Sequence, residues 1–146
     1  MTETTNSRKK SMKKIFIHGI VAGVIAAITS VIYFYLYQSA LHTAFDKIIN
    51  PGAIFGSSVF GCVLISIGDM LIQKLKPAKL KGIYNLLLIV LSFASIIGPI
   101  GISLPLNIEA PELFPGLVIP MHFFPALVYF AIEPFFGTSE KTSLIK

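Results

Sequence analysis

Four long apolar runs without Lys or Arg constrain this chain more than any other feature. They cover Ile15–Tyr37, Gly52–Ile72, Ile83–Leu104 and Leu117–Phe136. Each is about 20 residues long, which as an α-helix crosses roughly 30 Å of hydrocarbon. A buried helix of a soluble protein rarely needs so long an apolar run. The runs therefore predict an all-α protein, a four-helix transmembrane bundle.

Composition argues against a soluble protein and against a nucleic-acid partner. Only 13% of the residues are charged, whereas soluble domains carry about a quarter. The formal net charge is +5, but the basic residues cluster beside the apolar runs, and aromatic residues do not interleave with them. The expected partner is therefore the lipid bilayer.

The distribution of basic residues predicts the orientation of the bundle. Eleven of the twelve Lys and Arg residues lie in the N-terminal segment, between the second and third runs, or after the fourth run; the exception is Lys47. Short cytoplasmic loops carry an excess of Lys and Arg. We therefore expect up-down topology with the N-terminus, the middle loop and the C-terminus in the cytoplasm, in a bacterial inner (plasma) membrane.

These patterns divide the chain into one membrane domain and two tails. Residues 1–14 are polar and basic, and are expected to form a disordered cytoplasmic tail. Residues 15–136 hold the four spans, and residues 137–146 form a second cytoplasmic tail. The run that begins at Ile15 exceeds the apolar core of a signal peptide, about 7–15 residues, so it is interpreted as a retained span.

Two GxxxG patterns, Gly19…Gly23 and Gly52…Gly56, offer small-residue surfaces on which helices approach closely in lipid. They predict either packing inside the bundle or the face of a homodimer. Three prolines of the fourth run and Pro99 of the third predict bends. Each interior proline also frees a carbonyl that another group must satisfy.

Polar and small side chains fall on one face of each run, at about 100° per residue. On the second run this face consists of Ser58, Cys62, Ser66, Asp69 and Gln73. Polar groups turn away from lipid, so the bundle core is expected to be more polar than its rim. Two interpretations stay open: direct helix–helix hydrogen bonds, or a hydrated cavity or ligand pocket.

Ionisable residues inside spans are functional candidates. His18, Asp69 and Glu133 lie near the cytoplasmic ends, and with Asn85 they form a candidate polar cluster that would relay protons or bind a cation or polar head group. Alternatively, their side chains reach water or pair with nearby lysines such as Lys74. His122 lies nearer the outer face, as a packing residue or as a ligand.

Enzyme chemistry and metal binding find no support in the sequence. Cys62 is the single cysteine, and no Cys and His residues have zinc-site spacing. No nucleophile–base pair can be assembled, so the protein is not expected to be an enzyme. Neither a metal nor a cofactor is expected.

Short four-span proteins include the small multidrug exporters, but those depend on a glutamate in the first span, which this chain lacks. Redox membrane families built on CxxC pairs are excluded because Cys62 is alone. The four-run layout, with Pro120-Met-His122 opening the last span, resembles uncharacterised bacterial four-span families classed as domains of unknown function. The resemblance implies the fold and no activity.

Two functions remain open at this level. The first is a binding or accessory membrane protein with a polar-lined core, which packs against itself or against a partner protein. The second is a small oligomeric proton- or cation-coupled transporter or channel that uses Asp69, Glu133 and His18. Because the acids lie near the membrane edge rather than at its middle, the first is favoured.

Overall fold

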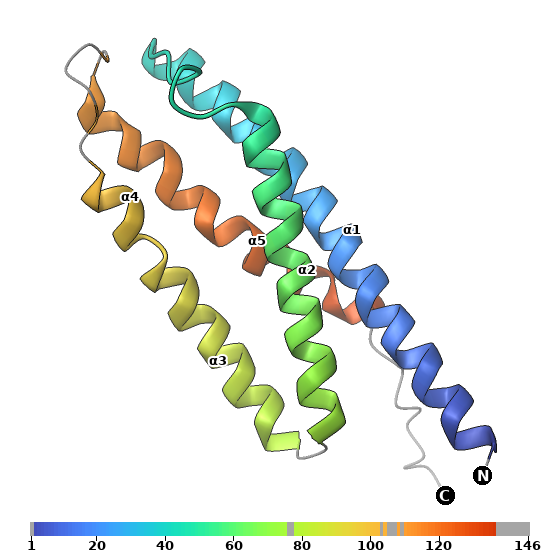
Figure 1. Cartoon of the computed structure of the whole chain (residues 1–146). Coiled ribbons are helices and arrows are strands. Elements are labelled where there is room, and N and C mark those ends of the chain that lie inside the picture. Colours follow the sequence, from blue (N-terminus) through green and yellow to red (C-terminus); the bar gives the residue numbers. More distant parts are fainter. Residues whose placement is uncertain (1, 76–77, 103, 105–107, 109, 137–146) are drawn as a thin grey trace, which may run out of the picture.

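The computed structural model describes residues 2–75, 78–102, 104, 108 and 110–136, with side chains from residue 12 onward except at 78 and 79. This part of the chain is all-helical (Figure 1). The elements are α1 (Thr2–Leu41), α2 (Pro51–Leu75), α3 (Ala78–Ala94), α4 (Ile97–Gly101), the 3-10 turn η1 (Pro111–Leu113) and α5 (Phe114–Phe136).

Within these described residues, four helical segments are long and apolar enough to cross a membrane, as predicted. They are Met12–Leu41, Pro51–Leu75, Leu80–Gly101 and Pro111–Phe136. Most span boundaries differ from the expected ones by a few residues, and two starts differ more. α1 begins at Thr2, within the predicted tail, where no Gly or Pro interrupts a helix before Gly19. The fourth segment begins at Pro111, because proline is well tolerated in a first helical turn. The tail predicted for residues 137–146 lies outside the described residues.

The start of α2 is set by its own residues. The side-chain carbonyl oxygen of Asn50 accepts a hydrogen bond from the backbone N–H of Ala53 at 2.7 Å, and its main-chain carbonyl accepts from Ile54 at 3.2 Å. Asn50 therefore caps the helix, and Pro51 occupies the first helical position, where its missing N–H costs nothing. The Asn50-Pro51-Gly52 turn thus begins the second span.

The third span is interrupted where proline predicts a bend. α3 ends at Ala94 and α4 begins at Ile97. Pro99 has no N–H to donate to the carbonyl four residues earlier, that of Ser95. The chain tightens there instead: the N–H of Ile96 bonds to the carbonyl of Phe93 at 3.2 Å, one residue closer than in an α-helix.

Helices α1, α2 and α5 form the packed part of the bundle, whereas α3 and α4 lie to one side of it (Figure 1). A Cβ added at Gly23 would lie 2.9 Å from the Cα of Val59, and one at Gly19 would overlap Ser66. The first GxxxG pattern therefore packs inside the chain, between α1 and α2. Gly56 of the second pattern has no heavy atom within 4 Å of its added Cβ.

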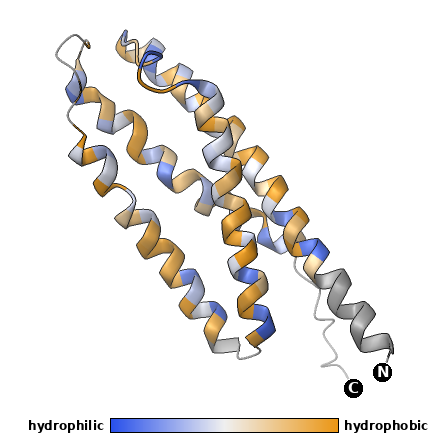
Figure 2. Cartoon of the chain, viewed as in Figure 1, coloured by the Kyte–Doolittle hydropathy of each residue, from blue (hydrophilic) through white to orange (hydrophobic). Residues whose placement is uncertain are grey.

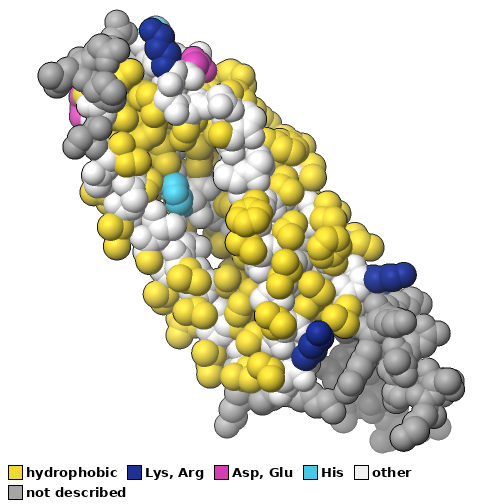
Figure 3. All heavy atoms as spheres, in the orientation of Figure 1, with side chains coloured by type: hydrophobic (Ala, Val, Ile, Leu, Met, Phe, Trp, Pro, Cys, Tyr) yellow, Lys and Arg dark blue, Asp and Glu magenta, His cyan; other side chains and the backbone are white. Residues whose placement is uncertain are grey.

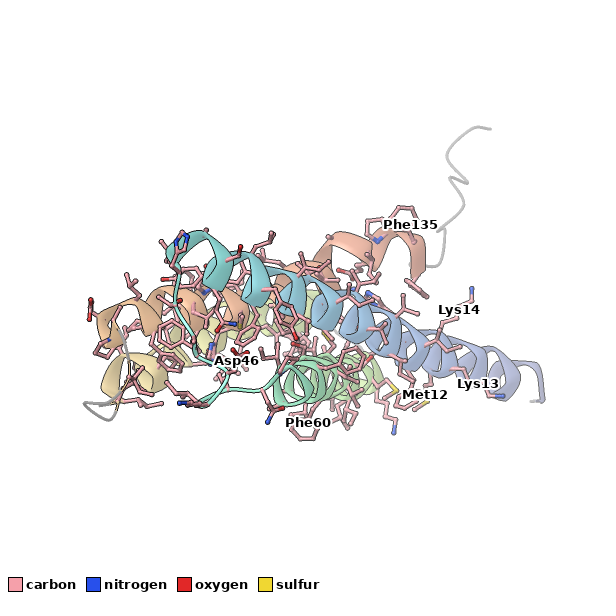
Figure 4. The ribbon with its side chains drawn as sticks, turned by 90° about the horizontal axis from the view of Figure 1, so that it is seen from above. Met12, Lys13, Lys14, Asp46, Phe60 and Phe135 are labelled. Atoms are coloured by element: carbon pink, nitrogen blue, oxygen red, sulfur yellow. The ribbon has the colours of Figure 1, made fainter. Side chains whose placement is uncertain are left out.

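Every long helix exposes large apolar side chains, and hydrophobic residues predominate along these helices (Figure 2). Phe60 and Phe135 point away from the bundle (Figure 4), and are 64% and 85% exposed. The buried residues of α2, by contrast, are Ile54, Ser58, Cys62, Ser66 and Asp69. The predicted polar face of the second span is thus turned inward, except at Gln73, which is exposed.

Candidate functional site

Three helices bring a histidine, a tyrosine and an aspartate together in the packed part of the bundle. His18 of α1 is buried, and its Nε2 lies 3.0 Å from the main-chain carbonyl of Tyr129 on α5. Because a carbonyl only accepts, Nε2 is the donor. The imidazole also stacks on the Tyr129 ring at 4.1 Å and on Phe136 at 4.9 Å, so that both of its faces are covered.

The Tyr129 hydroxyl links this histidine to Asp69 of α2. It donates to Oδ2 of Asp69 at 3.3 Å. Asp69 is only 5% exposed, and its Oδ1 has no hydrogen-bond partner among the described residues. A buried carboxylate with an unused acceptor is costly in a low-dielectric interior. His18, Asp69 and Tyr129, with the fully buried Ser66 beside them on α2, are called the polar cluster below.

Two further hydroxyls tie the neighbouring helices together around the polar cluster. Ser66 donates to the carbonyl of Ile15 on α1 at 2.5 Å, and Tyr84 of α3 donates to the carbonyl of Ile65 on α2 at 2.6 Å. The Tyr84 ring lies against Gly68, where a Cβ would approach its carbons to 2.8 Å. All four spanning helices therefore contribute a polar side chain to this region.

The structure unites only part of the cluster predicted from the sequence. His18 and Asp69 meet through Tyr129 rather than directly. Glu133 forms an ion pair with Lys81, at the start of the third span, and both side chains are partly exposed. Glu133 thus follows the alternative interpretation, in which an acid pairs with a nearby lysine, although Lys74 was the example named. Asn85 is half-buried and has no hydrogen bond to the described side chains of the polar cluster.

Tyr129 and Tyr84 were not among the candidate residues. Tyr129 falls on the same helical face as His122 and Glu133, which was the available signal. Nothing in the sequence separates Tyr84 from its neighbour Asn85. Its role depends on Gly68, whose missing side chain admits the Tyr84 ring.

His122 occupies a separate place, at a cavity of about 320 Å³ between the first half of α2 and α5. Its Nδ1 lies 2.9 Å from the carbonyl of Val118, one turn earlier on α5. The cavity runs from exposed residues such as Ser57 to buried ones such as Ser58 and Met121. Figure 3 shows a hollow beside a histidine side chain on this face of the molecule.

A proline in α5 leaves one backbone carbonyl without its helical hydrogen bond, and a tyrosine of α1 donates to that carbonyl instead. Pro120 has no N–H for the carbonyl of Gly116, and the Tyr33 hydroxyl donates to that carbonyl at 2.9 Å. Tyr37 donates to the carbonyl of Leu113 at 2.7 Å. These two bonds hold the start of α5 against α1.

Within the part of the chain that the structure describes, no three His, Cys, Asp or Glu side chains are placed to hold a metal ion. The one cysteine, Cys62, is buried and its thiol lies 3.5 Å from the carbonyl of Pro125. No family model, curated protein or solved structure matches the chain.

Proposed function

We propose that the protein is a multi-pass membrane protein that acts by binding a lipid-soluble molecule in the cavity between α2 and α5. The cavity carries the proposal, because it is concave, mostly apolar and holds a few polar groups, as small-molecule sites do. The long helices expose large apolar side chains, among them Leu36 and Leu86, as helices that face lipid do. No chemistry of the protein's own is required.

The proposed orientation is up-down in a bacterial inner membrane, with both termini in the cytoplasm. It is supported by the eleven basic residues at the predicted cytoplasmic segments and by the single Lys47 opposite. In a Cys62→Ser background, Asp46→Cys should react with an impermeant maleimide on intact cells. Lys74→Cys should react only after permeabilisation. The reverse pattern would contradict the orientation.

The binding role is tested with a photoactivatable alkyl diazirine added to the protein in nanodiscs. Labelling should concentrate on the peptides that hold Ser57 and His122, and Ala53→Phe, which fills the cavity, should reduce it several-fold. Phe60→Leu, at an exposed position of the same helix, is the matched control and should leave labelling unchanged. Uniform labelling along all lipid-facing helices, unaffected by Ala53→Phe, would refute the role.

Proton- or cation-coupled transport, by an oligomer or a single chain, is the second candidate. It is favoured by one observation: Oδ1 of the buried Asp69 has no hydrogen-bond partner in the described part of the chain. In liposomes, Asp69→Asn and Glu133→Gln should then abolish flux driven by a proton or sodium gradient. If the wild type shows no flux under either gradient, or if both variants match it, this function is excluded.

A further inference from the structure

The polar groups that line the cavity between α2 and α5 have a common property: each already donates its proton in a hydrogen bond within the protein. The hydroxyl of Ser57 donates to the carbonyl of Ile54 at 3.1 Å, and that of Ser58 donates to the same carbonyl at 2.9 Å or to the hydroxyl of Ser30 on α1 at 3.4 Å, so that both protons are used within the protein. A serine hydroxyl has one proton and two lone pairs. Each serine oxygen therefore remains available to a ligand as an acceptor, not as a donor.

His122 also donates its proton within the protein and keeps an acceptor for a ligand. The Val118 carbonyl can only accept, so Nδ1 of His122 is the protonated nitrogen of that 2.9 Å contact. In the neutral imidazole the other nitrogen, Nε2, then carries a lone pair. Since Nδ1 is turned to the helix backbone, Nε2 and the ring edge are what His122 presents to the cavity it lines.

We propose that this cavity binds a neutral lipid through a free hydroxyl group, which donates its proton to Nε2 of His122. The proposal rests on the binding function above and names its ligand class. The two serine oxygens can accept only from a ligand that brings a donor, and an ester, ether or ketone head brings none.

The lack of charged lining residues and the volume of the cavity restrict the class of ligand further. Among the described residues that line the cavity, none is Asp, Glu, Lys or Arg. An ammonium or phosphate group would be buried without a counter-charge, which is far costlier than burying a hydroxyl. A volume of about 320 Å³ holds roughly ten groups of the size of a water molecule. It therefore accommodates the hydroxyl end of the lipid, while the rest of the chain extends into the bilayer.

Selectivity for a donor is tested with two photoactivatable probes that share one alkyl-diazirine chain, a primary alcohol and its methyl ether. In wild-type protein in nanodiscs, the alcohol should label the cavity about three- to tenfold more than the ether, the range expected for one net hydrogen bond. Equal labelling by the two probes, reduced alike by Ala53→Phe, would overturn the hydroxyl proposal and leave the binding function standing.

His122→Phe keeps an aromatic ring and removes the acceptor. It should lower labelling by the alcohol to the level of the ether and leave the ether unchanged. Phe123→Leu, on the next residue of α5 and outside the cavity lining, is the control and should preserve the preference. An unchanged preference in His122→Phe would contradict the assignment of the acceptor. Should that variant fail to fold, the alcohol-to-ether ratio of the wild type decides the proposal.

Competition separates two sources of the hydroxyl. Unlabelled dioleoylglycerol should displace the alcohol probe if the ligand is a glycerolipid, and unlabelled farnesol should do so if it is an isoprenoid alcohol. Displacement by either supports the proposal. Displacement by neither, at concentrations at which the unlabelled parent alcohol of the probe competes, would overturn a lipid ligand of this class.

Discussion

The two ends of the α1–α2–α5 bundle are packed by different means. At one end, Phe34 and Phe45 are fully buried in a cluster completed by residues such as Phe114 and Leu117 of the last span. At the other end three of the four buried core residues are small, among them Ala22, the fourth is Tyr129, and the polar cluster crosses between the helices. We call the first the aromatic end and the second the polar end.

This contrast shows two ways to hold helices together in lipid. Lipid provides no hydrophobic drive for helix association, so close packing and hydrogen bonds must supply it. At the aromatic end, large rings fill most of the space between the helices, and the cavity is the unfilled space beside these rings. At the polar end, the small residues Gly23 and Ala22 allow α1 to approach α2 closely. Hydroxyl groups such as that of Ser66 then form hydrogen bonds between the two helices.

The largest expected effect lies at the aromatic end. Phe34→Ala removes a fully buried ring and should lower the free energy of unfolding by about 3–5 kcal/mol. Unfolding by SDS in mixed micelles measures the loss. Phe60→Ala removes the same ring from an exposed site of α2 and should cost less than about 0.5 kcal/mol. Similar losses for the two variants would mean that the aromatic end does not depend on packing.

A second variant tests close approach at the polar end. Gly23→Leu forces side-chain atoms against the backbone at Val59 and should cost about 1–3 kcal/mol. Gly56→Leu, where an added Cβ meets no atom within 4 Å, should leave the free energy of unfolding nearly unchanged. The same control addresses the homodimer that the second GxxxG pattern suggested: if Gly56→Leu abolishes a cross-linked dimer, that glycine lies in an interface between copies.

The last comparison takes one tyrosine from each end, and the tyrosine of the aromatic end has the smallest expected effect. Tyr129→Phe deprives buried Asp69 of its hydrogen bond and should cost about 1–3 kcal/mol. Tyr33→Phe removes the bond to the Gly116 carbonyl, which is exposed, and should cost about 0.6 kcal/mol, the average for hydrogen bonds between membrane helices. Unfolding of both variants in the same micelles gives the comparison. A greater loss for Tyr33→Phe would invert the contrast between the ends.

Patterns along the chain were enough for much of the fold. Length and apolarity predicted the four spans, because a helix in lipid must satisfy its backbone internally and present apolar side chains outward. The interruption before Pro99 followed from one missing N–H. The inward face of α2 followed from helical periodicity, since Ser58, Cys62 and Ser66 recur every four residues.

The candidate site depended on contacts between helices, which periodicity does not contain. The sequence grouped His18 with Asp69 but not with the tyrosine that joins them, and it placed Glu133 in the same group although Lys81 holds it. These outcomes depend on how each helix is rotated and at what depth it crosses its neighbour. A polar face on one helix predicts which side of that helix turns inward, but not which residue of a neighbouring helix it will contact.

By itself, then, the sequence determined that the described part of this chain forms four long apolar helices and that the polar face of α2 turns inward, because each of those properties belongs to a single helix. Only the tertiary structure decided which carbonyl the imidazole of His18 meets, which oxygen of Asp69 bonds to Tyr129, and that a cavity opens beside His122. Those features arise where side chains from different helices either fill or fail to fill the space between them.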